Sequence, residues 1–412
     1  MRILHLANLY APLIGGLERS IATSSEELIR RGHEVTVLTL ATPAAPARSE
    51  TIRGVRVLRV PSIATTALPG LNQDPRKPFH PTAPDPVTTR AIGKALRAEP
   101  YDVVHSHDWL MYSYLPINRG RTKRPHVHTA HDYGLLCAKK TMVPGCPGPR
   151  LSRCIPCATG QYGRVKAAVL ATALRANAHQ GIDLVTAISS SVAGALKDAR
   201  LPSGIPVKTI SSLVPDGLDD LARATKRPSW LPNTPYLLFV GALGPHKGID
   251  VLFAAYRKLR AGWPGSEPAP RLVCLGTARP DTPEVPEGVV IRHDVPHAEV
   301  MAAWHGAVVG VVPSIMEAMG QVAVEALLAR TPLIASRTGG LADVVRHEES
   351  GLLVPPGDVD ALHAALVRLL TEPGLAQRLR QEGHRRGLDF TAARVVPQIE
   401  EAYRECIAVF NG

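Results

Sequence analysis

Short apolar runs rich in β-branched residues alternate with helical segments along almost the whole chain, and the alternation starts afresh near residue 236. In the first half, HEVTVLTL and GVRVLRV are typical of strands, and LERSIATSSEELIRR has apolar residues at helical spacing. In the second half, YLLFVGALG and VVGVVPS repeat the strand pattern. A strand–helix–strand order needs a crossover connection and therefore a parallel sheet. The sequence predicts an α/β protein with two Rossmann-like, doubly wound domains.

The domain boundaries follow from the stretches without periodicity. Residues 220–235 hold three prolines and no regular pattern, which indicates a linker. We therefore expect a first domain over residues 1–219, a second over 236–388, and a C-terminal helix over 389–412 that packs back on the first domain. Residues 61–86 hold seven prolines and predict a long loop.

Ligands of doubly wound sheets bind at the carboxyl ends of the strands, near helix N-termini. Two such sheets facing each other imply a cleft between the domains, suited to a phosphate-bearing ligand. Dehydrogenases and epimerases share this architecture, so the fold does not choose the reaction.

The charge of the chain is uneven. The formal net charge is +11, of which residues 1–219 carry +12 and residues 220–412 carry −1. A basic first half suits an anionic acceptor, an anionic membrane surface or nucleic acid, although a solvated arginine-rich surface is the simpler interpretation. No nucleic-acid motif is present, so no nucleic-acid partner is expected, and membrane-surface association is the less favoured alternative.

The N-terminal stretch MRILHLANLY favours a buried first strand over a signal peptide, because a turn and a helical pattern follow it without a cleavage site. No run of apolar residues approaches the roughly 18 that a spanning helix needs. A cytoplasmic protein is expected.

The stretch SIMEAMGQVAVEALLA carries the sharpest local signal. Glu317 follows a strand, and Glu325 is separated from it by seven residues, about a turn and a half into a helix that should begin near Met319 or Gly320. Free N–H groups at that helix start suit diphosphate or hydroxyl oxygens. Two surface glutamates would be the simpler interpretation, but the apolar surroundings of Glu325 make an unpaired carboxylate there costly.

The residues from PSIMEAMGQVAVEALLARTPLIASRTGGLADVV to ESGLLVPPGD resemble the donor-site signature of the family 4 retaining glycosyltransferases, which have the GT-B fold. FVGALGPHKGIDVL, PDGLDD and GGLERSIATSSEELIRRGHEVTVLT are similar to further segments of that family, in the same order. The resemblance implies that Glu317 contacts the hydroxyls of the donor sugar, Glu325 the ribose and Lys247 the diphosphate. The implied donor site comprises Gly15, Gly16, Lys247, Glu317, Ala318, Met319, Gly320, Gln321, Glu325, Gly339 and Gly340.

One position departs from the family. An arginine usually follows the glycine at 241, and this chain has Ala242. We expect helix N-termini, His246 or Arg337 to take over part of the phosphate stabilisation. The two glycine pairs, Gly15–Gly16 and Gly339–Gly340, each follow a strand and are expected to let a ligand approach the backbone.

His131, at the end of PHVHTAHD, matches the family's histidine near the reacting sugar. The resemblance makes His131 a catalytic candidate beside Glu317 and Lys247, and places Asp132 and Tyr133 at the acceptor. His105, His107, His126 and His128 are equally close in sequence but are interpreted as structural.

Four of the six cysteines fall within 21 residues: Cys137, Cys146, Cys154 and Cys157. Cys-x-x-Cys spacing suits two ligands of one tetrahedral ion, and the other two thiols complete a four-thiolate structural zinc site. Four reduced thiols, or a fortuitous disulfide, are an equal alternative, and an iron–sulfur cluster is a distant one. A similar cysteine-rich insertion occurs in part of family 4.

The sequence therefore predicts a retaining glycosyltransferase that uses a nucleotide-diphosphate sugar, UDP- before GDP-, and a small-molecule, glycan or lipid acceptor. No catalytic divalent metal is expected, because Asp358 and Asp360 precede a helix that they are suited to cap. The alternatives are a GT-B-fold sugar-nucleotide epimerase and, because of Ala242, a catalytically inactive sugar-nucleotide-binding protein.

Overall fold

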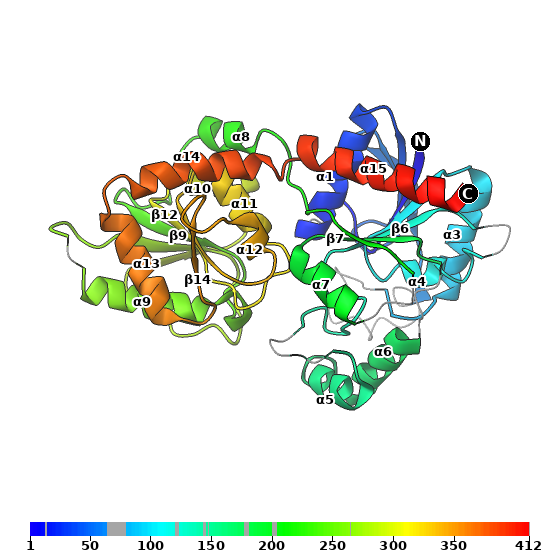
Figure 1. Cartoon of the computed structure of the whole chain (residues 1–412), viewed down its shortest axis with the longest axis horizontal. Coiled ribbons are helices and arrows are strands. Elements are labelled where there is room, and N and C mark those ends of the chain that lie inside the picture. The colour runs from blue at the N-terminus through cyan, green and yellow to red at the C-terminus, as the bar shows by residue number, and fades with distance from the viewer. Residues whose placement is uncertain are drawn as a thin grey trace. The chain divides into compact units, whose positions relative to one another are not determined.

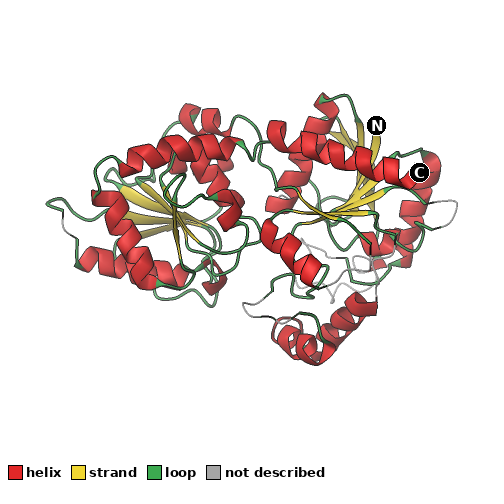
Figure 2. Cartoon of the chain, in the orientation of Figure 1, coloured by secondary structure: helices red, strands yellow, loops and turns green. Residues whose placement is uncertain are grey.

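The computed structural model describes residues 1–12, 15–63, 80–119, 123–142, 146, 148–176, 181–199, 204–263 and 265–411. They divide into two compact units. The first comprises Met1–Leu213 and the chain from Ala392 on, and the second comprises Val214–Thr391. Each unit is a sheet covered by helices (Figures 1 and 2).

The sheet of the first unit has the order β3-β4-β2-β1-β5-β6-β7-β8, and every pair is parallel except β3 with β4. Its strands are β1 (Arg2–Ala7), β2 (Glu34–Leu40), β3 (Ser49–Ile52), β4 (Val55–Val60), β5 (Val103–Ser106), β6 (His126–Ala130), β7 (Leu184–Ala187) and β8 (Val207–Thr209). The strand order reverses between β1 and β5. The carboxyl ends of these two strands are therefore where a doubly wound sheet leaves room for a ligand.

The helices of the first unit cover both faces of this sheet (Figure 2). They are α1 (Gly16–Arg30), α3 (Pro86–Ala98), α4 (Met111–Tyr114), α5 (Leu151–Tyr162), α6 (Arg164–Ala176), α7 (Ser190–Asp198) and α15 (Ala392–Asn411). The C-terminal helix α15 packs against α1 and β6 (Figure 1). Tyr403 and Val396 of α15 join the same buried cluster as Ile3 of β1 and Val127 of β6.

The sheet of the second unit has the order β11-β10-β9-β12-β13-β14 and is parallel throughout. Its strands are β9 (Tyr236–Val240), β10 (Arg271–Leu275), β11 (Val289–Arg292), β12 (Val309–Val312), β13 (Leu333–Ser336) and β14 (Leu352–Val354). Its helices are α8 (Leu218–Ala224), η3 (Pro245–Lys247), α9 (Ile249–Ala261), α10 (His297–Gly306), α11 (Gln321–Leu328), α12 (Leu341–Val344), α13 (Val359–Thr371) and α14 (Leu375–Leu388). The order reverses between β9 and β12, which makes their carboxyl ends the expected ligand position.

The two doubly wound sheets confirm the predicted fold class. The structure differs at the stretch assigned as a linker, 220–235, because these residues belong to the second unit. Helix α8 packs against α10, and the indole of Trp230 donates to Glu299 Oε2 at 2.7 Å. Proline-rich sequence here reflects irregular backbone that is nonetheless packed. Of the expected loop 61–86, residues 64–79 lie outside the described part of the chain.

One further element differs from the sequence prediction, and another agrees with it. The end of the cysteine-rich stretch, expected as a loop, is helical as α5, which pairs with α6 as a helical hairpin (Figure 1). Asp358 caps α13 as expected, because its carboxylate accepts the N–H of Ala361 at 2.9 Å.

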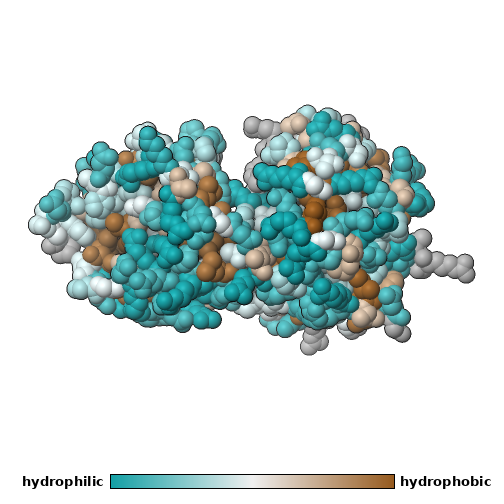
Figure 3. All heavy atoms as spheres, turned by 90° about the horizontal axis from the view of Figure 1, so that it is seen from above, coloured by the Kyte–Doolittle hydropathy of each residue, from teal (hydrophilic) through white to brown (hydrophobic). Residues whose placement is uncertain are grey.

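The face drawn in Figure 3 is mostly hydrophilic, with small hydrophobic areas scattered over it. Among the described residues, no helix has the length and apolarity needed to cross a membrane.

Candidate functional site

Lys247 and Glu317 face each other across the switch point of the second unit. Lys247 ends η3, which follows β9, and Glu317 lies in the loop after β12. The Lys247 ammonium donates to Glu317 Oε2 at 2.6 Å, and Ser314 Oγ donates to the same oxygen at 3.2 Å. Both side chains are partly buried, with 27% and 15% of their surface exposed. A cation and an anion thus lie together at the carboxyl ends of the two central strands.

The loops that carry this pair are in direct contact because they contain glycine. Gly248 has φ +68°, and a Cβ there would lie 1.9 Å from the backbone oxygen of Pro313. Gly339 has φ +49°, and its Cβ would lie 1.7 Å from the backbone oxygen of Glu317. The N–H of Gly340 donates to that oxygen at 3.1 Å. Gly339 and Gly340 therefore hold the backbone of Glu317, whereas the sequence analysis expected them to face a phosphate.

Helix α11 begins one residue later than the sequence suggested. Gly320, with φ +90°, is its N-cap residue, and Gln321 is its first residue. Ala318 and Met319 connect Glu317 to this helix start. The arrangement gives the N-terminus of α11 a position directly after Glu317, as expected.

Glu325 is buried on α11, with 6% of its surface exposed. Its Oε1 lies 2.9 Å from Nε2 of His297, the first residue of α10. The sequence analysis required a partner for this carboxylate and did not find His297, because the two residues are brought together only by packing of α10 on α11.

A second cation, Arg279, lies near His246, and its Nε donates to Asp281 Oδ1 at 3.1 Å. Arg279 belongs to the loop after β10, which is joined to the loop after β9 by hydrogen bonds between Leu243 and residues 277 and 282. A Cβ on Gly244 would lie 3.0 Å from Cδ of Arg279 and 3.0 Å from Nδ1 of His246. Burial, and then the charges of Lys247 and Arg279, lower the pKa of His246. Sequence reasoning missed Arg279, since nothing local marks its approach to His246.

In the first unit, the glycine pair after β1 lies at the start of α1. Gly15 is the N-cap residue and Gly16 the first residue of this helix. The N–H of Gly15 donates to Glu18 Oε2 at 2.8 Å. A carboxylate of the chain itself therefore occupies the place at which a ligand anion was expected.

His131 lies just beyond β6 and lines a small pocket with His107, Asp108, Trp109 and Lys140, among others. The Lys140 ammonium lies 4.4 Å from the centre of the Trp109 ring. Burial, and then the Lys140 charge, lower the pKa of His131 to about 3. The imidazole is therefore neutral at physiological pH.

Asp108 lies deep in the same pocket. Burial raises its pKa to about 6, although Lys140 and the N–H groups of Asn8 and Leu110 act in the opposite direction. Those two N–H groups donate to its two carboxylate oxygens, which joins the carboxyl ends of β1 and β5.

The two acceptor candidates after His131 both have partners within the chain. Asp132 Oδ1 accepts the N–H of Gly134 at 2.6 Å, which fixes the turn. The hydroxyl of Tyr133 lies 2.9 Å from Oγ of Ser191 on α7. Asp132 lines the pocket beside His131.

The four clustered cysteines are free thiols. Burial, and then proximity to Cys157, Cys154 and Cys146, raises the pKa of Cys137. In the described part of the chain, no three of these sulfurs lie within 4.8 Å of one another. The thiols are thus neighbours but are not gathered at coordination distance.

Comparison with known proteins gives matches over both units. The family model of glycosyl transferases group 1 matches residues 223–386, and that of glycosyltransferase family 4 matches residues 14–214. D-inositol 3-phosphate glycosyltransferase from Acidothermus cellulolyticus is 31% identical over 411 residues, which cover 96% of this chain and 86% of that protein. The enzyme of the same name from Corynebacterium glutamicum is 27% identical and covers 96% and 93%.

The chain belongs to the family 4 glycosyltransferases. As a member it is a retaining glycosyltransferase of the hexosyltransferase type with a nucleotide-sugar donor. The resemblance seen in the sequence is confirmed at this level, but its finer part, a subgroup with a cysteine-rich insertion, is not confirmed.

Solved structures match the fold of this glycosyltransferase over nearly the whole chain. Sucrose-phosphate synthase from Thermosynechococcus elongatus has a TM-score of 0.75 and 23% identity, and covers 99% of each chain. The Anabaena protein Alr3699/HepE in complex with UDP and glucose has a TM-score of 0.67 and 17% identity, and covers 98% of this chain and 100% of that one. At these identities the likeness establishes the GT-B fold alone.

Proposed function

We propose that this glycosyltransferase transfers a hexosyl group from a UDP-sugar, with retention, to a hydroxyl of a small-molecule, glycan or lipid acceptor. The ion pair of Lys247 and Glu317 at the start of α11 carries the proposal. A diphosphate needs a cation and N–H donors at one place, and a donor sugar needs a hydroxyl acceptor beside them.

Donor binding rearranges the contacts of Lys247. Its ammonium has three N–H donors, so it can bind a phosphate oxygen while it keeps the bond to Glu317. Glu317 then accepts from the sugar hydroxyls through Oε1, for which no partner in the chain is found among the described residues. Glu325, already ordered by His297, is positioned to accept from ribose hydroxyls.

The chemical step exchanges one C1–O bond for another on the same face of the sugar. The bond from C1 to the phosphate oxygen breaks, the bond from C1 to the acceptor oxygen forms, and the acceptor proton goes to the leaving phosphate. The developing negative charge on that phosphate is stabilised by Lys247, and we assign the second cation to Arg279 because Ala242 has no charge.

The acceptor contacts belong to the pocket of His131 in the first unit. Its lining includes the cation Lys140, which suits an acceptor that carries a phosphate. The curated relatives are named D-inositol 3-phosphate glycosyltransferases, so phosphorylated cyclitols and sugar phosphates are the acceptors to test first.

A structural zinc site on Cys137, Cys146, Cys154 and Cys157 completes the proposal. The donor set is that of closed zinc sites, and two of its members lie one turn apart on α5. Zinc would hold the α5–α6 hairpin to the turn that follows His131, and it would take no part in the reaction.

The first experiment measures binding of UDP, GDP, ADP and dTDP by calorimetry and thermal shift. UDP should bind most tightly. Lys247→Met should weaken UDP roughly ten- to hundredfold and leave uridine binding unchanged, because a charge-assisted hydrogen bond to phosphate is lost. Lys258→Met is the matched control, since Lys258 also pairs with a carboxylate, Asp360, in the same unit. Equal UDP affinity in all three proteins refutes the diphosphate site.

The second experiment follows UDP release from UDP-hexoses with and without inositol 3-phosphate, free inositol and sugar phosphates. Release that requires an acceptor, with an α-linked product from an α-linked donor, is the expected result. An isomerised sugar nucleotide without acceptor supports the epimerase alternative. Binding without release for every donor and acceptor supports the inactive one.

A further inference from the structure

We propose that His107 and His5 are positioning residues that fix which ring nitrogen of His131 carries the proton. The inference deepens the proposed role of His131 in the acceptor pocket and rests on it for its functional meaning. The three imidazoles are linked end to end, from the buried centre of the sheet to the pocket.

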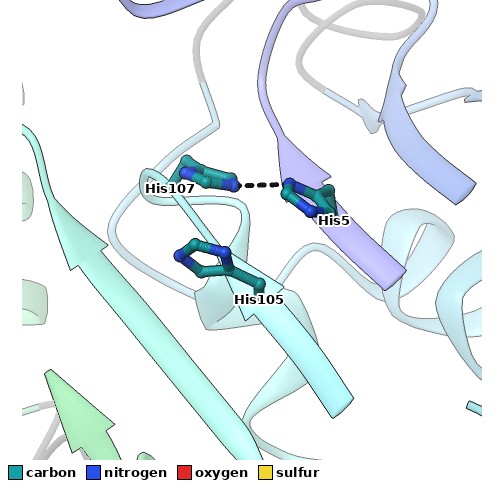
Figure 4. Close-up of side chains that lie close together, drawn as sticks. All are labelled: His5, His105 and His107. Atoms are coloured by element: carbon teal, nitrogen blue, oxygen red, sulfur yellow. Dashed lines mark hydrogen bonds between the residues drawn. The ribbon is translucent and has the colours of Figure 1, made fainter. Parts of the chain in front are cut away.

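The strand register brings His5, His105 and His107 to one face of the sheet. His5 on β1 is the register partner of His105 on β5, and His107 lies two residues further along, on the same face. His5 Nδ1 lies 2.8 Å from His107 Nε2 (Figure 4), and His107 Nδ1 lies 3.0 Å from His131 Nε2. Each link thus joins one nitrogen of a ring to one nitrogen of the next.

A metal ion is the obvious alternative, because the nitrogens of His5, His105 and His107 come within 4.8 Å of one another. However, both nitrogens of His105 are occupied, by the hydroxyl of Tyr403 at 2.6 Å and that of Thr129 at 2.6 Å. Both nitrogens of His107 are also used, by His5 and His131. The lone pairs are directed at these partners and not at a common centre, so the cluster is a hydrogen-bonded chain.

The rings of His5, His107 and His131 are all neutral, which restricts how their protons can be arranged. Burial lowers the pKa of His5 to about 3, and burial together with the neighbouring histidines lowers the pKa of His107 well below its usual value. A neutral imidazole has one N–H and one lone pair, so the proton position on one ring dictates the others. Two orders remain, with all protons directed toward the pocket or all directed toward the core.

His5, at the buried end of the three linked imidazoles, determines which of these two proton arrangements is adopted. His5 Nε2 is buried and has no hydrogen-bond partner. Protons directed toward the core would leave an unpaired N–H there, and unpaired buried N–H groups are rarer in proteins than unpaired acceptors. His5 therefore carries its proton on Nδ1 and donates to His107, which donates to His131. His131 accepts at Nε2 and carries its own proton on Nδ1.

This tautomer makes His131 a hydrogen-bond donor to the pocket. Nδ1 is the nitrogen of His131 without a partner among the described residues. It presents an N–H to an oxygen of the bound sugar or phosphate, and it cannot take a proton from the acceptor.

The test is ¹⁵N NMR of protein labelled at histidine, which reports the proton position on each ring without any substrate. The signals of His131 are assigned as those that disappear in His131→Asn. They should show a protonated Nδ1 and an unprotonated Nε2. His107→Phe should convert this pattern into a mixture of tautomers. His107→Asn should restore it, because the asparagine amide places a donor near the position of Nδ1.

His126→Asn is the control, since His126 is buried in the same sheet and bonds Ser106 and the backbone of Gly181 outside the chain of three. It should leave the His131 pattern unchanged. A proton on Nε2 of His131 in the wild type overturns the proposal, as does the same pattern in His107→Phe. Failure of nucleotide binding would instead refute the proposed function and leave this result untouched.

Discussion

Replacement of Glu400 by glutamine should destabilise the first unit strongly. Glu400 is 3% exposed on α15 and accepts from Arg31 Nε at 2.9 Å and from Arg31 Nη2 at 2.8 Å. His33 Nε2 lies 2.7 Å from its Oε1. These contacts join the C-terminal helix to the end of α1 and the start of β2. An amide in place of the Glu400 carboxylate keeps the shape of the side chain, removes its charge, and leaves Arg31 without this ion pair.

The pKa of Glu400 gives the magnitude. The hydrogen bond from Arg31, first among several causes, lowers the pKa from 4.5 to about 2. At 1.36 kcal/mol per unit, this corresponds to about 3 kcal/mol at neutral pH. Because the folded pKa lies below the unfolded one, the contribution is complete above pH 4.5 and is lost as the pH falls toward 2. The difference in the free energy of unfolding between wild type and Glu400→Gln should therefore become smaller below pH 4.5.

Scanning calorimetry at pH 7 and at pH 4 measures the effect. A loss of about 3 kcal/mol should lower the melting temperature of a unit of this size by roughly 6–12 °C. Glu401→Gln is the matched control. Glu401 is the next residue of the helix, its side chain is 61% exposed, and it forms a surface ion pair with Arg404. It should cost less than about 1 kcal/mol. Equal melting temperatures for the two variants would refute the reasoning.

Three further predictions concern the second unit and the cysteines. Gly248→Ala should cost more than about 3 kcal/mol in urea unfolding, because its Cβ meets a backbone oxygen, whereas Gly374→Ala, at a similar φ with open space, should cost only about 1–2 kcal/mol. His297→Ala should destabilise the unit by about 1–3 kcal/mol and weaken UDP binding, since Glu325 loses its hydrogen bond to His297. Metal analysis of purified protein should find one zinc per chain, lost in Cys154→Ser; zinc-free wild type would remove that site.

Most of the fold follows from the sequence because its signal is local. Each strand of the two sheet centres is a short, largely apolar run, and the parallel arrangement follows from the helix between strands. The elements that the sequence did not reveal are short, such as β3 and α12, or lie in proline-rich stretches, such as α8. Their position is set by packing against other elements, which periodicity does not encode.

The positions of the main candidate residues could be predicted for the same reason, but the contacts that these residues make could not. Glu317 was found because it follows a strand, and Lys247 through the family resemblance; both lie where the carboxyl ends of neighbouring parallel strands meet at one edge. Their direct bond, and the approach of Arg279 to His246, depend on how separate loops pack. The same holds for His297, which lies 28 residues from Glu325 in the chain.

Protonation is the property that the sequence leaves most open, and the two units illustrate this differently. An ordinary histidine titrates near neutral pH, and the resemblance that singled out His131 says nothing about its protonation. In the structure, burial and the Lys140 charge keep the ring neutral, so its contribution to a reaction depends on which nitrogen bears the proton. That choice is made by His107, which the sequence suggested was structural, and by His5, which the sequence analysis did not single out. In the second unit, the Lys247 ammonium donates to Glu317, and a diphosphate would compete for that same cation. At the proposed donor site two opposite charges are therefore paired, whereas at the proposed acceptor site burial and a nearby cation keep the imidazole neutral.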